Sequence, residues 1–279
     1  MTTSEVNDGH ASASDRSGTG ASRRKITPLI RALGHRELTL LVRYPVNTVS
    51  LFASMFVFFA LIFFGGRAVA GGAITNSADG IVVGFFLWTL VTRAFQSLAS
   101  SITREAQWGT LERLYMSPYG FGAVMSVKAV VDLCLSVAWA GAMLVPMMLV
   151  SGQWLHLDPL TVVPLVVLAI TPVVGLGFLM GGLALLYKRV ENLFGIVTFG
   201  FAGLIAAPVE QFEILKFLPL AQGSHLIRTT MTEGVRLWEF PVGDLAFLIG
   251  TAVGYIFVGF YCFRHAEHRA RDRGLLGQY

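Results

Sequence analysis

The stretch from residue 160 to residue 187 reads LTVVPLVVLAITPVVGLGFLMGGLALLY and contains no charged side chain. A helix needs about 20 mostly apolar residues to cross the roughly 30 Å hydrocarbon core of a bilayer. We therefore expect a membrane-spanning helix here. Its prolines and glycines permit kinks and close helix approach inside a bundle, with a moving hinge as the alternative. These residues are Pro164, Pro172, Gly175, Gly177, Gly181 and Gly182.

Apolar blocks of this kind recur along the chain. Of its 279 residues 54% are hydrophobic and 14% are charged, whereas about a quarter of a soluble domain is charged. The composition therefore indicates an all-α integral membrane protein with six transmembrane helices. The other five spans are expected at about 46–64, 81–100, 121–150, 193–209 and 244–264.

The segments around the spans differ in character. Residues 1–22 are rich in Ser, Thr, Gly and Ala, which predicts a disordered cytoplasmic tail. Residues 23–45 predict an amphipathic interfacial helix with basic flanks, capped by Thr27 and ended by Pro45. An ordinary solvated helix is the alternative. Residues 46–264 would form the transmembrane domain and 265–279 a basic cytoplasmic tail.

Basic residues predict how the chain is oriented. With a cytoplasmic amino terminus, the cytoplasmic segments hold fifteen Lys and Arg residues and the outer segments four. Because cytoplasmic loops are enriched in Lys and Arg, this split favours both termini inside and an even number of spans. We expect a multi-pass protein of the plasma membrane. The four outer cations are Arg67, Lys216, Arg228 and Arg236.

The segment 210–243 before the last span alternates apolar and charged residues. We expect two short helices or a re-entrant hairpin near the outer surface, broken at Pro219 and Gly223, because such backbone is tolerated where protein or water covers it. A simple outer loop is the alternative. Phe212, Leu218 and Arg228 belong to this predicted hairpin.

The most informative motif is EAQWGTLERLYMSP, residues 105–118, between the second and third spans. Trp108, Leu111 and Tyr115 fall on one face at helical spacing, whereas Glu112 points elsewhere. Pro118 ends the element before the third span. The motif therefore predicts a short cytoplasmic helix that presents apolar side chains and a carboxylate.

This motif closely resembles the cytoplasmic signature of the ABC-2 family of transporter permeases. The resemblance covers the amino-terminal helix, the six spans and the hydrophobic outer hairpin, where Leu218-Pro219-Leu220 and Arg228 look like the family's Pro…Arg pattern. It implies a coupling helix that docks on a separate ABC ATP-binding subunit; shaping the loop alone is the alternative. The residues carried over are Glu105, Gly109, Thr110, Leu111, Glu112, Leu114, Ser117 and Pro118.

The resemblance also implies the assembly. Two permeases, identical or related, would pair with two ATP-binding subunits and export an amphipathic or lipid-like cargo along the first, second and fifth spans. ATP and Mg²⁺ would bind the partner subunit, because this sequence has no Gly-x-x-x-x-Gly-Lys-Ser/Thr phosphate loop. We expect no enzymatic activity, cofactor or metal in this chain itself, and no nucleic-acid partner.

Several further charges need an explanation. Lys188, Arg189 and Glu191 form a second short cytoplasmic loop, which is either a second contact with the ATP-binding subunit or a topology signal alone. Arg93, Lys128 and Asp132 lie within spans, where charged residues face the bundle or pair. Lys128 and Asp132 are four residues apart and can neutralise each other, with Lys128 snorkelling toward the cytoplasm as the alternative. For Arg93 we expect a structural pair, with a partner protomer or a water-filled path as the alternative.

Two other classes of function remain open. An ion-coupled secondary transporter would show inverted repeats and buried acidic groups at mid-membrane; Asp132 is a candidate, but no internal repeat is evident. A non-transporting membrane scaffold or sensor component would keep the cytoplasmic helix without a substrate path.

Overall fold

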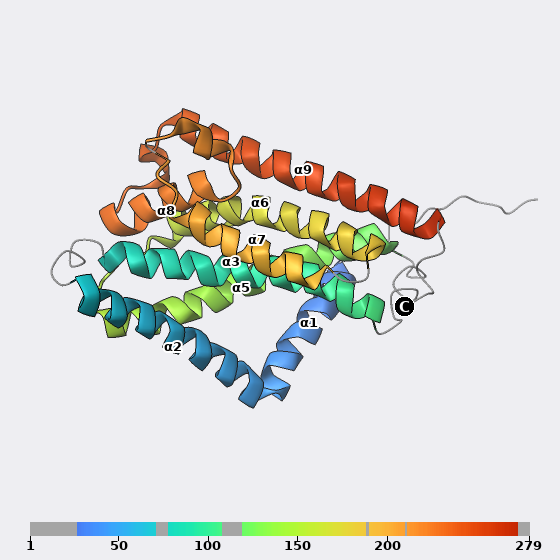
Figure 1. Cartoon of the computed structure of the whole chain (residues 1–279), viewed down its shortest axis with the longest axis horizontal. Coiled ribbons are helices and arrows are strands. Elements are labelled where there is room, and N and C mark those ends of the chain that lie inside the picture. The colour runs from blue at the N-terminus through green and yellow to red at the C-terminus, as the bar shows by residue number, and fades with distance from the viewer. Residues whose placement is uncertain (1–26, 71–77, 108–118, 188–189, 210, 273–279) are drawn as a thin grey trace, which may run out of the picture.

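The computed structural model describes residues 27–70, 78–107, 119–187, 190–209 and 211–272, and all regular structure in these ranges is helical (Figure 1). The fold is therefore all-α, as the sequence predicts. The elements are α1 (Thr27–Arg43), α2 (Pro45–Ala70), α3 (Ala78–Gln107), α5 (Phe121–Ser151), α6 (Pro159–Leu186), α7 (Glu191–Ile205), η2 (Glu213–Phe217), α8 (Ala221–Glu233), η3 (Leu237–Glu239) and α9 (Val242–Asp272).

Five of these helices, α2, α3, α5, α6 and α9, are long and apolar enough to cross a membrane. They indicate a multi-pass membrane protein. The predicted fifth span corresponds to α7, which has 15 residues. At about 1.5 Å per residue it is roughly 22 Å long, shorter than the hydrocarbon core of about 30 Å. The sixth crossing therefore stays a prediction.

Glycines of α6 set the centre of the bundle. A Cβ atom on Gly175 or Gly259 would collide with the other helix's backbone, so α6 and α9 touch there directly. On its other side α6 meets α3, where Gly177 and Gly181 contact Leu98 and Ile102. This confirms the predicted packing role of these glycines, because small residues let helices approach closely in a membrane.

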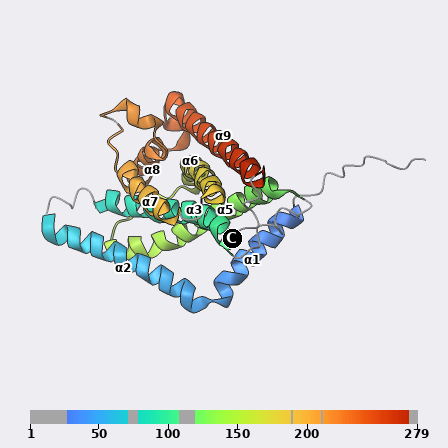
Figure 2. The same cartoon turned by 45° about the vertical axis from the view of Figure 1, so that its right-hand side comes forward.

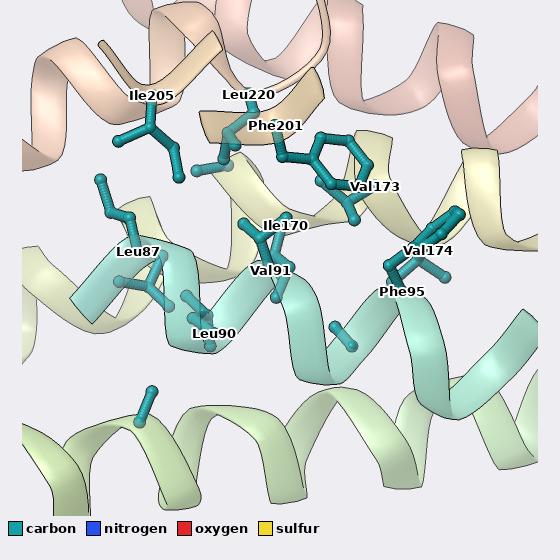
Figure 3. Packing of buried hydrophobic residues seen from close by; sticks show 14 of the residues in the cluster. Leu87, Leu90, Val91, Phe95, Ile170, Val173, Val174, Phe201, Ile205 and Leu220 are labelled. Carbon is teal, nitrogen blue, oxygen red and sulfur yellow. The ribbon is translucent and has the colours of Figure 1, made fainter. Parts of the chain in front are cut away.

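Apolar side chains of α3 fill the space between α6, α7 and α8 (Figure 3). Because these side chains come from helices far apart in sequence, they hold the bundle as one core. The residues labelled in the figure are Leu87, Leu90, Val91, Phe95, Ile170, Val173, Val174, Phe201, Ile205 and Leu220, each less than 8% exposed.

The segment between α7 and α9 is folded back against the bundle. Leu220 precedes α8 with φ 76°, a left-handed conformation, so the chain turns sharply after Pro219. Gly223, however, does not break the helix: it lies inside α8, where a Cβ would collide with Ala169 of α6. The prediction of a break at Gly223 is wrong, because close packing rather than turn formation requires a glycine there.

Hydrogen bonds fix this segment to its neighbours. The Tyr255 hydroxyl donates to the Phe217 carbonyl at 3.1 Å, and Gln222 Nε2 donates to Asp244 Oδ1 at 3.2 Å. Lys216 Nζ lies 3.4 Å from the same Asp244 oxygen. Within this segment η2 and α8 are two short helices, whereas the re-entrant hairpin stays a prediction.

Helices α1 and α2 form a V beside the bundle (Figure 1, Figure 2). α1 ends at Arg43 and α2 begins at Pro45, as predicted for the residue before a proline. Among the residues of α1 none is fully buried. Leu29 packs against the core, whereas Leu38 and Val42 are exposed. Apolar residues thus lie on both the packed and the exposed sides of α1.

The contact between α6 and α9 predicts an asymmetry between two glycines of α9. Gly259→Ala should lower the free energy of unfolding by about 1–3 kcal/mol, because an overpacked contact forces the backbones apart. Gly250→Ala is the matched control, since a Cβ there meets nothing within 4 Å, and should be neutral or stabilising by up to about 1 kcal/mol. SDS titration in mixed micelles followed by circular dichroism measures both; equal effects would contradict the contact.

Candidate functional site: a charge cluster and a cleft beside α3

Charged side chains from three helices meet in the half of the bundle next to α1. Lys128 Nζ of α5 lies 3.3 Å from Asp132 Oδ2 and 3.6 Å from Glu37 Oε1 of α1. The side chains of Lys128 and Asp132 are 11% and 4% exposed, and that of Glu37 is 29% exposed. The predicted pairing of Lys128 with Asp132 is confirmed, and one cation between two carboxylates ties α1 to α5.

Arg93 of α3 completes this charge cluster with a different kind of contact. Its guanidinium carbon lies 4.4 Å from the centre of the Trp139 ring on α5, within the range of a cation–π interaction. Electrostatic attraction from Asp132 and Glu37 also acts on it. No ion pair within 4 Å involves Arg93 in the described part of the chain, so the predicted structural pair is replaced by a ring contact.

A second ion pair links α1 to the end of α3. Arg36 Nη2 lies 3.8 Å from Glu105 Oε1. Because Glu105 opens the 105–118 motif, α1 contacts the helix that leads directly into that motif. An exposed pair of this kind contributes about 1 kcal/mol or less, so it positions α1 more than it stabilises the fold.

A polar cleft runs between α3 and the α1–α2 pair. Its volume is about 540 Å³, and Thr89, Arg93, Gln96, Ser100 and Arg104 line it from α3. These positions recur every three or four residues, so they form one polar stripe along the helix. A neighbouring space of about 510 Å³ shares Arg93, Glu37 and Trp139.

The hydrogen bonding of two polar groups in the cleft differs. The Thr92 hydroxyl is buried and makes no hydrogen bond to any described residue. Arg104 Nη1 donates to the Ser100 hydroxyl at 3.0 Å. Since buried polar groups are nearly always paired, an unpaired hydroxyl on a cleft wall is a potential ligand contact.

On the opposite half of α3 the wall becomes apolar. A groove of about 370 Å³ lies between α2, α3 and α7, and Phe58, Phe85, Trp88 and Phe199 line it. Arg228 of α8 lies at this groove and is the one charged residue among the described residues that line it. Within the described part of the chain no group of three His, Cys, Asp or Glu side chains could hold a metal ion.

The predicted site residues fall in separate places. Glu105 lies at the end of α3, whereas the other seven motif residues, Gly109, Thr110, Leu111, Glu112, Leu114, Ser117 and Pro118, lie outside the described residues, as do Lys188 and Arg189. Glu191 is the first residue of α7. Phe212 and Leu218 are exposed near η2 and Pro219 follows them. Among the predicted site residues that the structure describes, it brings Arg93, Lys128 and Asp132 into one cluster.

Glu37 and Trp139 are the cluster members that the sequence interpretation missed. Glu37 is the single carboxylate of α1, in a helix with three arginines. A lone acid in a basic helix was the available signal, since it predicts a cationic partner elsewhere. Trp139 carried no such signal, because a tryptophan in a span is ordinary.

Comparisons with protein-family models, with curated proteins and with solved structures gave no match. The fold and site define a multi-pass helical membrane protein with a charged cleft inside its spans. Any narrower assignment depends on the residues themselves.

The residues of the charge cluster should contribute unequally to the free energy of unfolding. Lys128→Met should lower the free energy of unfolding by about 3–5 kcal/mol, because it leaves Asp132 buried without its nearest cation. Glu37→Gln should cost less than about 1 kcal/mol, because Glu37 is partly solvated. The double variant Lys128→Met with Asp132→Leu should recover most of the loss.

Equilibrium SDS unfolding of the purified variants measures these differences. If Lys128→Met cost no more than Glu37→Gln, the central place of Lys128 in the cluster would be refuted.

Proposed function

We propose that this chain is the permease subunit of an ATP-driven ABC exporter and acts with a second permease and separate ATP-binding subunits. The observation that carries the proposal is the 105–118 motif, with its resemblance to the cytoplasmic signature of ABC-2 permeases. The all-α fold with five long apolar helices is compatible with that family.

The position of the motif supports a coupling role. α3 ends at Gln107 and α5 begins at Phe121, so the motif joins two long apolar helices directly. A push on the motif would therefore move both helices, and through Arg36 and Glu105 it would also reach α1. Such contiguous contacts are the physical basis on which movements of an ATP-binding subunit would reach the membrane.

The exposed side of α2 supports pairing with a second permease. Val46, Val49, Val57 and Leu61 are each more than half exposed, and α2 touches the bundle mainly through aromatic contacts such as Phe52 with Trp139 at 5.7 Å. In the proposed assembly, α2, α3 and α7 face the second subunit, and lipid covers the other faces.

An ion-coupled transporter is the second candidate, and the Lys128–Asp132 pair favours it. A buried carboxylate next to a cation inside a span is typical of proton relays. Transport that persists without an ATP-binding subunit and collapses with a protonophore would select this candidate over the exporter.

The coupling proposal predicts a local effect of the motif. Leu111→Ala with Glu112→Ala should weaken binding of the candidate ATP-binding subunit at least about tenfold and abolish stimulation of its ATPase, because an apolar side chain and a carboxylate are lost together. Trp154→Ala is the control, since it is 76% exposed in the α5–α6 connection at the other end of α5. Unchanged binding and hydrolysis in the double variant would exclude the coupling assignment.

The six-span topology predicts that both termini lie on one side. Cys134 and Cys262, both exposed, are first replaced by alanine, and a single cysteine is then placed at Ser4 or at Gln278. If α7 crosses the membrane, both termini are cytoplasmic. An impermeant thiol reagent added outside should then label both positions in inverted vesicles, whose cytoplasmic face is outward, and neither position in right-side-out vesicles. Labelling from opposite sides would show five crossings and leave α7 out of the membrane count.

A further inference from the structure

We infer that the cleft and the groove beside α3 form one furrow that binds a lipid-like anion drawn from the cytoplasmic leaflet. This inference names the class of cargo. It rests on the proposed function, which defines the cytoplasmic and outer ends of the furrow. The acidic or phosphate head would lie against Arg93, and the apolar chain would lie in the groove toward Arg228.

The two spaces are adjacent along α3. Phe58 of α2 lines both of them, and the consecutive residues Trp88 and Thr89 line the groove and the cleft respectively. The lining positions of α3 extend from Gly80 to Arg104, about 36 Å at the helical rise. That length matches a hydrocarbon core of about 30 Å, so the furrow crosses the membrane with α2 as its other wall.

The inner half of the furrow is built to receive an anion. Arg93 lies near the middle of the apolar part of α3, where an ionised side chain is costly and marks a functional site. One face of its guanidinium lies over the Trp139 ring, and its N–H groups make no hydrogen bond to any described residue. A guanidinium with unused donors binds carboxylates and phosphates bidentately.

The neighbouring groups favour the same ligand. Lys128 and Asp132 offset each other at 3.3 Å, so the charged residues that line the cleft are Glu37, Arg93 and Arg104, with a net charge of one positive unit. Thr92 offers a buried hydroxyl without a described partner one residue before Arg93. Arg104 adds a second cation toward the end of α3 that leads into the motif. The charge on the cleft wall is therefore complementary to an acidic head group.

The outer half of the furrow accepts an apolar chain. Aromatic and small residues line it, including Phe85, Phe199 and Gly84, and pockets of this kind bind ligands by apolar burial with a few polar anchors. A small soluble anion would leave this half unused, and a neutral lipid would leave Arg93 unused. A lipid that moved from the cytoplasmic leaflet into the furrow would keep its orientation, with the head inward and the chain outward, and its head would reach the level of Arg93 near the middle of α3.

The test measures binding to the purified full chain in nanodiscs of zwitterionic lipid, without ATP or a partner. The probes are stearic acid and stearyl alcohol, each with a nitroxide near its polar end, and the readout is quenching of tryptophan fluorescence. The acid should bind about tenfold more tightly than the alcohol, as expected for one charge-assisted contact. Trp139→Phe should reduce the quenching, because Trp139 lies beside Arg93, and Trp88 at the groove should account for the remainder.

Arg93→Gln should reduce the affinity for the acid to that for the alcohol. Arg67→Gln is the matched control, because Arg67 is an exposed arginine of α2 that does not line the furrow, and should leave both affinities unchanged. Should Arg93→Gln fail to fold, Thr92→Val replaces it and should weaken acid binding about threefold, with alcohol binding unchanged.

Equal affinities for the acid and the alcohol in the wild-type chain would overturn the inference, as would acid binding unaffected by Arg93→Gln or, in its place, by Thr92→Val. Because the binding assay contains no ATP-binding subunit, its failure leaves the exporter proposal standing. Conversely, if the chain binds the acid selectively but stimulates no ATPase, the inference about the furrow is supported and the exporter proposal is contradicted.

Discussion

In α6 and α9 two backbones touch, because Gly175 and Gly259 carry no side chains at the crossing. Lipid tails are as apolar as leucine, so helices in a bilayer associate through van der Waals contact rather than through exclusion of water. Close contact between backbones maximises that attraction. The other helices are arranged around this pair: α3 packs on the face of α6 that carries Gly177 and Gly181, and α8 meets α6 through Gly223. The segment that holds η2 is in turn fixed to α9.

The charged cluster has the opposite character. Glu37, Arg93, Lys128 and Asp132 are two acids and two bases, so their formal charges cancel. Neutrality lowers the cost of placing Arg93, Lys128 and Asp132 inside spans, yet a well-packed apolar set would be at least as stable. Arg93 in particular uses a ring rather than a carboxylate as its closest partner. A cluster that is neutral as a whole but leaves donors unused on one member is organised for a role other than stability.

Much of the fold follows from length and period in the sequence. The block 160–187 became α6 (Pro159–Leu186) and the block 121–150 became α5 (Phe121–Ser151), because an uninterrupted apolar run in lipid has to form a helix to pair its own backbone. The helix in the expected span 193–209 ends early, at Ile205. Pro208 indicates an early end, because the residue before a proline disfavours the helical conformation, whereas hydropathy does not register this effect. α9 extends to Asp272, beyond the expected 264, because polarity marks where lipid ends and not where a helix ends.

The site was less accessible to the same reasoning. The pairing of Lys128 with Asp132 is local and follows from their spacing, whereas Glu37 and Trp139 reach the cluster through helix packing that no local pattern encodes. Gly223 shows the same limit: a glycine predicts a break or a close approach equally well, and Ala169, more than fifty residues away, decides which. Contacts across the bundle thus determine the chemistry that the sequence only outlines.

The crossing of α6 and α9 has a mechanical consequence for the molecule. Two helices whose backbones are in direct contact have to separate before they can slide along each other, so α6 and α9 should move as one rigid unit. α2 meets its neighbours through ring contacts that include Phe52 on Trp139 and Phe59 on Phe85, and it joins α1 at a single residue, Tyr44. Hydrogen bonds from the Thr48 hydroxyl to the Leu41 and Tyr44 carbonyls brace this corner, so a force on α1 would be transmitted to α2 while the α6–α9 pair keeps its shape.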